Sequence, residues 1–276
     1  MPDEVEMAGM HGHHMGDPAG VPMADRGPDR DGLSLDRLHV PLGPVLVDWP
    51  GGLVADTVLQ GDVVQEAAVR VLDGGAGESF WDAPWVSAAR GEPVTRGRGE
   101  RWRAASHLDS LGRLLAVADW ESAARTARRL RDRLLAGEAW ASRRGSSVGD
   151  ARLVRDFGRF ARRVRGSRVL GWMLRGIGPV PADSGLGEWA TGDALDRMRW
   201  WLDRTGEALL VLDDRTPLQG DDGPRAAAHE GVSRRVIEAL PSLLAGAEWA
   251  GTRLIVASLD PDVAQVAHDV TAGRRP

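Results

Sequence analysis

Three polar residues near the C-terminus, Asp262, Gln265 and His268, follow one another at intervals of three in the segment DPDVAQVAH, residues 260–268. An apolar, strand-like run comes directly before them, so they occupy the polar turn after a buried element. Their spacing resembles that of a metal site from which the metal ligands are missing. The chemistry available at this turn is therefore that of one carboxylate, one carboxamide and one imidazole.

A second group of candidate metal ligands lies near the N-terminus, in MHGHHM: His11, His13, His14, Met10 and Met15. Imidazole and thioether groups are donors that suit copper or nickel. The surrounding residues 1–32 are rich in Gly, Pro, Met, Asp and His and have no helical or strand periodicity, so we expect a disordered tail. The simpler interpretation, which we favour, is a solvated tail whose histidines bind metal only adventitiously.

The composition excludes several kinds of chemistry. The 276 residues contain no cysteine, tyrosine, lysine or asparagine. Without cysteine the chain can provide neither disulfides nor thiolate ligands for nickel, zinc or iron–sulfur clusters. The formal charge of −5 argues against a nucleic-acid-binding protein, because such proteins carry a clustered basic excess.

The hydropathy of the chain predicts its location. No apolar run approaches the roughly 20 residues that cross a bilayer, and the N-terminus begins with acidic residues rather than with the apolar segment of a signal peptide. We therefore expect a cytoplasmic protein, or one that lies peripherally on the inner face of a membrane.

Strands are predicted near the N-terminus. Turn signals at residues 50–52 and 61–62 divide residues 40–72 into alternating apolar stretches joined by tight turns. Residues 77–101 read as an irregular loop, which Trp81 and Trp85 would anchor to the body of the protein.

Helices are predicted for the middle of the chain. Apolar residues at helical spacing indicate two helices within 102–137, with Asp119 as a cap and Gly137 as the end, then further helices within 151–185, 193–206 and 233–249. The apolar runs 207–213 and 252–260 read as short strands. Arg125, Arg129 and Arg133 form a stripe with a spacing of four, which is either a solvated face or a surface for an anion or a partner.

These elements predict an α+β fold with a helical-bundle core, an N-terminal antiparallel hairpin or small sheet, and short C-terminal strands. With 42% hydrophobic residues the chain can bury a large core, so residues 33–276 are expected to form one domain after the tail of residues 1–32.

Two segments resemble the metal-binding motifs of the large subunit of nickel–iron hydrogenases. That family ends in D-P-C-x-x-C-x-x-H, and here Asp262 and Gln265 stand at the cysteine positions while His268 keeps the histidine. The family also carries R-x-C-x-x-C-x-x-x-H. The segment RGERWRAASH matches it with Arg98 and His107 kept and with Glu100 and Arg103 at the cysteine positions.

Three further segments match in the same order along the chain. Residues 178–185, GPVPADSG, resemble the G-P-V-x-R-x-S-G loop of the hydrogenases, with Ala182 in place of the arginine. Residues 222–226, DGPRA, resemble E-x-P-R-G and keep Pro224 and Arg225. Residues 43–62 are similar to the G-P-Q-H-P-S-T-H-G-V-L-R-L hairpin of the related complex I subunit, the 49 kDa-type subunit that forms the quinone site.

The resemblance implies a family fold from which the family chemistry is missing. Hydrogen activation requires four thiolates, and the hairpin histidines linked to quinone chemistry align here with Leu46 and Pro50. The implied role is a non-catalytic subunit that scaffolds a hydrogenase or complex I small-subunit-like iron–sulfur protein. The cluster would then belong to that partner, and the assembly could include membrane subunits and resemble an NADH dehydrogenase.

Two further expectations follow. If the family geometry is kept, the loop before His107 and the turn after residue 260 lie side by side, and Arg103 and Asp262 are the pair expected to form a salt bridge. The alternative function is a metal-handling accessory protein that captures nickel or copper with its His- and Met-rich tail.

Overall fold

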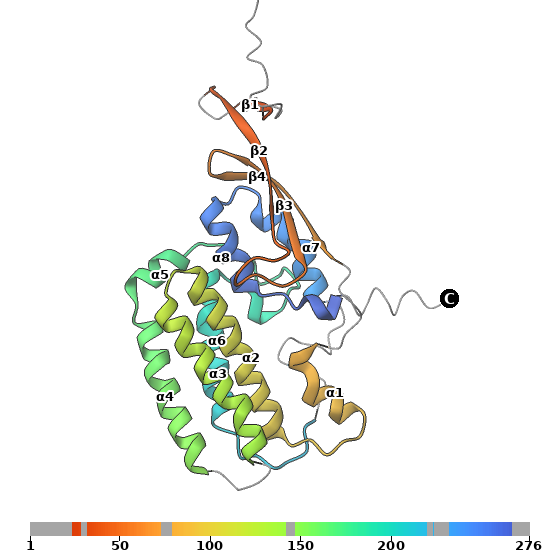
Figure 1. Cartoon of the computed structure of the whole chain (residues 1–276), viewed down its shortest axis with the longest axis vertical. Coiled ribbons are helices and arrows are strands. Elements are labelled where there is room, and N and C mark those ends of the chain that lie inside the picture. Colours follow the sequence, from red (N-terminus) through yellow and green to blue (C-terminus); the bar gives the residue numbers. More distant parts are fainter. Residues whose placement is uncertain are drawn as a thin grey trace, which may run out of the picture.

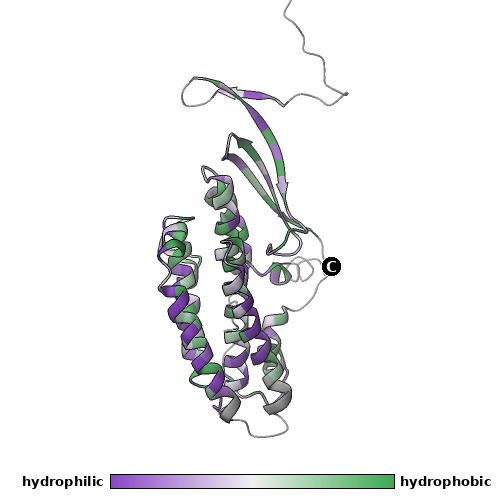
Figure 2. Ribbon diagram, turned by 60° about the vertical axis from the view of Figure 1, so that its left-hand side comes forward, coloured by the Kyte–Doolittle hydropathy of each residue, from purple (hydrophilic) through white to green (hydrophobic). Residues whose placement is uncertain are grey.

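The structure is a computed structural model that describes residues 24–28, 32–72, 79–141, 147–219, 223 and 232–266. A bundle of long helices forms one end of the molecule, and an antiparallel sheet with two covering helices forms the other (Figure 1). Figure 2 shows the same two parts from a second direction, with the strands projecting beyond the helices.

The sheet has four strands in the order β1-β2-β3-β4: Arg26–Pro28, Ser34–Leu42, Leu53–Gln60 and Val63–Val71. The hairpin predicted around residues 61–62 is confirmed, because Gln60 pairs with Val63 across that turn. Strand β1 lies inside the segment that was predicted to be a disordered tail, and Arg26 in it faces Asp36 of β2. Order therefore begins before the predicted boundary at residue 32, while residues 1–23 and 29–31 lie outside the described residues.

Helix α7, Val232–Leu244, covers the sheet from the side of β4. The turn that follows α7 continues the sheet, since the Val64 N–H donates to the Ala247 carbonyl at 2.9 Å and the Gly246 N–H donates to the Val64 carbonyl at 2.8 Å. Apolar side chains from the sheet and from the last two helices share one core, which includes Leu53, Ala55, Val236, Leu240, Leu244 and Leu259.

Four long helices form the bundle: α2, Arg96–Val117; α3, Glu121–Ala141; α4, Ser147–Arg165; and α6, Ala194–Leu209. Helix α2 begins where the Thr95 hydroxyl accepts the N–H of Arg98, a normal N-cap. Leu108, Leu111 and Leu115, whose helical spacing indicated this helix, are fully buried. Helix α2 packs against α3, α6 and α8 and is therefore buried on most of its circumference.

Helix ends differ from the prediction in two places. Gly137 does not end α3, which continues to Ala141, and Gly206 does not end α6, which continues to Leu209. A glycine costs only about 1 kcal/mol inside a helix, so it does not by itself end one.

The predicted C-terminal strands are wrong. Residues 252–259 belong to helix α8, Trp249–Leu259, and residues 207–209 are the last turn of α6. Eight of the eleven residues of α8 are buried, so the helix meets protein on nearly every side. A short, largely buried helix of this kind cannot be told from a buried strand by its sequence pattern.

The predicted loop 77–101 is also partly helical. It contains the 3-10 turn η2, Phe80–Asp82, the helix α1, Ala83–Ala89, and the first turn of α2. Pro84 in the first turn of α1 favours a helix start at this point. After α4, the short helix α5, Arg168–Leu174, and the 3-10 turn η3, Glu188–Ala190, lead to α6.

The fold class is thus the predicted mixture of α and β structure with a helical core. None of the helices in the described part of the chain combines the length and the apolarity that a bilayer crossing demands.

A substitution at Gly97, in the first turn of α2, tests how closely this helix packs against the loop after α6. A Cβ at Gly97 would lie 2.3 Å from the Leu212 carbonyl oxygen, whereas one at Gly158 in α4 meets only an arginine side-chain nitrogen, at 3.7 Å. We expect Gly97→Ala to lower the free energy of unfolding by about 2 kcal/mol and Gly158→Ala to raise it by up to about 1 kcal/mol. Urea unfolding followed by circular dichroism measures both, and equal effects of the two substitutions would contradict this packing.

Candidate functional site

A small cavity lies between α2 and the segment that follows α8. Its lining includes His107 of α2, Trp200 of α6, and Asp260, Pro261 and Asp262. The cavity measures about 20 Å³, so it is close to the size of a single water molecule. The structure thus brings His107 and Asp262 to one cavity although they are far apart in sequence.

His107 is held among aromatic side chains. It is 2% exposed, and its ring lies edge-on to the Trp200 ring with 5.3 Å between centroids. Trp189 and Trp201 complete the aromatic part of the lining. The lining of the cavity at His107 therefore combines aromatic side chains with the two aspartates Asp260 and Asp262.

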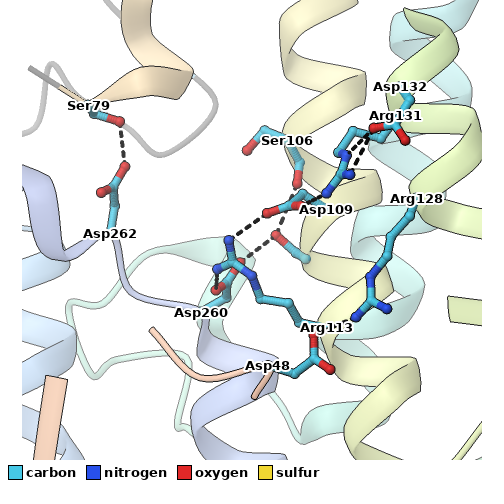
Figure 3. Close-up of polar contacts among 11 residues, drawn as sticks. Asp48, Ser79, Ser106, Asp109, Arg113, Arg128, Arg131, Asp132, Asp260 and Asp262 are labelled. Atoms are coloured by element: carbon cyan, nitrogen blue, oxygen red, sulfur yellow. Dashed lines mark hydrogen bonds and ion pairs between the residues drawn. The ribbon is translucent and has the colours of Figure 1, made fainter. Parts of the chain in front are cut away.

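Asp260 joins the C-terminal segment to α2. It ends α8 in a left-handed conformation with φ of 37° and is 2% exposed. One carboxylate oxygen accepts from Arg113 at 2.5 Å and the other accepts from the Ser110 hydroxyl at 2.8 Å (Figure 3). Asp260 and, to a lesser extent, Asp109 raise the pKa of Arg113 above its already high ordinary value, against the opposing effect of burial.

The charges continue from Asp260 across α2 to α3. Arg113 also donates to Asp109 at 2.6 Å, and Asp109 accepts from Arg131, which pairs in turn with Asp132 at 2.8 Å. Figure 3 shows this alternation of acidic and basic side chains running from the α8 end to α3. We call Asp260, Arg113, Asp109 and Arg131 the α2 clasp.

Asp262 and Gln265, the residues at the C-terminal cysteine positions of the hydrogenase motif, bond to other parts of the same chain. Asp262 accepts from the Ser79 hydroxyl. Gln265 donates to Asp82 at 3.0 Å and accepts from the Ser233 hydroxyl at 2.6 Å. These contacts connect the C-terminal segment to both ends of η2 and to the start of α7.

Glu100 and Arg103, the residues at the other two cysteine positions, line a different groove. They form an ion pair with each other at 3.3 Å, and the Arg103 guanidinium lies 5.2 Å from the centre of the Trp85 ring. Their groove, of about 530 Å³, is bounded by residues 216–219. The predicted salt bridge between Arg103 and Asp262 is wrong, because α2 carries Arg103 toward Trp85 and Asp262 turns toward Ser79.

The remaining predicted site residues contribute little to this geometry. Arg98 lies in the first turn of α2, where the Thr95 side chain caps its backbone N–H. Eight of the predicted site residues lie outside the described residues: Met10, His11, His13, His14 and Met15 in the tail, and Pro224, Arg225 and His268. Across the described ranges there is no group of three or more His, Asp or Glu side chains placed to hold a metal ion.

Sequence reasoning missed a buried arginine in α6. Arg197 is fully buried and donates to the Ser258 hydroxyl at 2.8 Å and to the Gly192 carbonyl at 2.7 Å. Burial lowers its pKa to about 10, while Asp193 and Asp196 oppose that shift, so the guanidinium stays protonated at neutral pH. Arg197 also bonds to the carbonyls of Ile177 and Ala190, and in this way holds both ends of the loop that contains GPVPADSG.

Asp109, Arg113 and Asp260 were missed as well. The only sequence signal was the spacing of four between Asp109 and Arg113, which also occurs in solvated ion pairs. Nothing in the sequence placed Asp260 next to them.

Comparisons with known proteins support the fold. A chain in the structure of the membrane-bound sulfane sulfur reductase (MBS), an archaeal respiratory membrane complex, is similar with a TM-score of 0.61 and 16% sequence identity, over 83% of this chain and 98% of that chain. At this identity the likeness shows a shared fold. Neither the protein-family models nor the curated protein sequences gave a match.

Replacement of Asp260 by asparagine tests the α2 clasp. Asparagine tolerates the left-handed backbone of this position, so the substitution removes mainly the charge that Arg113 and Ser110 contact. We expect Asp260→Asn to lower the free energy of unfolding by roughly 3 kcal/mol, as measured by urea unfolding.

The matched control is Asp262→Asn, which keeps an acceptor for Ser79 and should cost less than about 1 kcal/mol. If Asp260→Asn proved as mild as the control, the clasp would not stabilise the fold.

Proposed function

We propose that this chain is a subunit of a membrane-associated redox complex, in which it acts as a non-catalytic scaffold for an iron–sulfur subunit. The partner would be related to the small subunit of hydrogenases and complex I and would hold the cluster. The complex would lie on the cytoplasmic side of the membrane.

The observation that carries the proposal is the likeness to a chain of the MBS respiratory membrane complex. It extends over 98% of that chain, so it concerns a whole subunit rather than one shared motif. The segments that resemble hydrogenase and complex I motifs point independently to redox complexes. A fold alone does not assign chemistry, so the role depends on what the site residues do.

The four positions that hold metal in hydrogenases favour a role without metal chemistry. Glu100 and Arg103 pair with each other, and Asp262 and Gln265 bond to Ser79, Asp82 and Ser233. A metal ion at these positions would have to displace several of these contacts. Carboxylate, carboxamide and guanidinium groups also cannot replace bridging thiolates.

The proposal is tested by purifying the tagged full-length chain from detergent-solubilised membranes of its source organism. We expect an assembly with stoichiometric iron and the electron paramagnetic resonance spectrum of a reduced iron–sulfur cluster. Isolation of the chain as an iron-free monomer from both membrane and soluble fractions would contradict the proposal.

The substitution His107→Gln, made in the same assembly, distinguishes a scaffold from a catalytic subunit. A scaffold predicts an unchanged rate of cluster reoxidation in the variant complex, because the cavity at His107 takes no part in electron transfer. A lower rate in a complex that still assembles with full iron content would show that the cavity is catalytic.

The alternative function, metal handling by the tail, stays a prediction, since Met10, His11, His13, His14 and Met15 lie outside the described residues. Titration calorimetry with nickel and with copper, on the full chain and on a chain that lacks residues 1–23, measures it. A metal-handling protein would bind one of the ions tightly and lose that binding with the tail. Binding too weak to saturate would leave the scaffold role as the better account.

A further inference from the structure

One segment of this acidic protein is strongly basic. Residues 125–175 contain fifteen arginines and four acidic residues, a formal charge of +11 in a chain whose total is −5. In the described part of this segment, exposed arginines occur along α3, α4 and α5: Arg125, Arg129, Arg133, Arg152, Arg155, Arg159, Arg162, Arg163, Arg165, Arg168 and Arg175. Charge of one sign is thus gathered on one side of the helical bundle.

Helices α3 and α4 form a groove lined by these arginines. The end of α4 meets the start of α3, where Arg163 donates to the Ser122 hydroxyl at 3.3 Å and lies over the Trp120 ring. The groove has a volume of about 410 Å³. Leu130 and Phe160 form its floor, and four arginines surround them: Arg129, Arg133, Arg159 and Arg163.

Asp156 is the acidic side chain among the residues that line the groove. It accepts from Arg133 at 2.7 Å and lies 3.5 Å from Arg159. The hydrogen bond from Arg133, helped by the charges of Arg133, Arg159 and Arg152, holds the pKa of Asp156 below its ordinary value. One carboxylate therefore leaves a clear positive excess at the groove.

Helix α5 adds exposed apolar side chains beside this charge. It lies at the C-terminal end of α4 (Figure 1). Trp172 is 79% exposed and Val169 is 68% exposed, while Leu170 and Leu174 on the other side of α5 are buried. Exposed arginines stand on both sides of this pair, at Arg168 and Arg175.

We propose that the surface formed by the α3–α4 groove and the exposed side of α5, which we call the arginine face, binds an anionic lipid bilayer. Guanidinium groups form paired hydrogen bonds with phosphate. Tryptophan is enriched where a protein meets the headgroup region, and clustered basic residues are attracted to anionic lipid. The exposed pair Val169 and Trp172 favours a membrane over an acidic protein, because it gives the face a group that enters the headgroup layer.

This inference goes beyond the scaffold role and does not depend on an iron–sulfur partner. It is tested on the purified full-length chain alone, by flotation with vesicles of phosphatidylcholine and with vesicles that also contain phosphatidylglycerol. We expect binding only to the anionic vesicles, decreasing as salt is added because the attraction is screened. Equal binding to both kinds of vesicle, or binding to neither, would overturn the proposal.

The variant Arg129→Gln, Arg155→Gln, Arg159→Gln, Arg162→Gln removes four exposed arginines from the face. Each basic residue near an anionic surface contributes substantially to binding, so we expect at least about tenfold weaker binding. The control variant Arg26→Gln, Arg70→Gln, Arg199→Gln, Arg215→Gln loses the same charge from exposed positions elsewhere. An equal loss in the control would mean that net charge alone decides binding and would overturn the proposed location.

Trp172→Ser tests the contribution of α5, with Leu210→Ser as the control because Leu210 is 77% exposed on another helix end. We expect several-fold weaker vesicle binding for Trp172→Ser alone, and unchanged binding would remove α5 from the proposed face.

A chain that binds polyglutamate peptide but no vesicle would assign the arginines to an acidic protein partner and overturn the lipid proposal.

Discussion

The contact between Asp260 and Arg113 fixes the relation between the two parts of the molecule. Helix α8 ends at Asp260, whose buried carboxylate accepts from Arg113 and Ser110 of α2. Helix α2 lies at the centre of the bundle, and α8 packs against it with Leu254 and Ala257 in the bundle core and with Ile255, Val256 and Leu259 in the core of the sheet. A buried carboxylate is costly unless it is paired and hydrogen-bonded, so this end of α8 has one favourable position against α2. The direction of the chain after residue 260 follows from that position.

The segment after Asp260 then determines the size and the lining of the cavity at His107. Pro261 and Asp262 form part of its wall, and Asp262 and Gln265 are fastened to Ser79, Asp82 and Ser233. Where the hydrogenase motif would present thiolates to a metal, these side chains present hydrogen bonds to their own chain. The cavity that remains has space for about one water molecule. Its surroundings hold two segments of the same chain together.

The parts of the fold that were predictable are those with a clear local pattern. The hairpin at residues 61–62 has turn residues between alternating apolar stretches, and α2 has leucines at helical spacing. Helix α8 was not predictable in this way, because contact on most sides leaves its sequence without a helical alternation of polar and apolar residues. The candidate site was predicted as a set of segments but not as a set of contacts. Arg103 and Asp262 were expected to meet, yet their directions depend on Trp85 and Ser79, whose positions come from tertiary packing.

The chain contains arginine but no lysine. Some of its arginines are buried and bonded within the fold, whereas others are exposed and can contact a partner. Arg197 is enclosed and bonded to a hydroxyl and to backbone carbonyls, which offset the cost of burying a guanidinium that stays protonated. Arg113 is fixed between two aspartates. Most arginines of α4 are instead exposed, and exposed ion pairs add little to stability. The fold therefore does not require the positive excess on α3, α4 and α5. Self-repulsion makes such an excess mildly unfavourable in the isolated chain, so an anionic surface that lies against this face would relieve it.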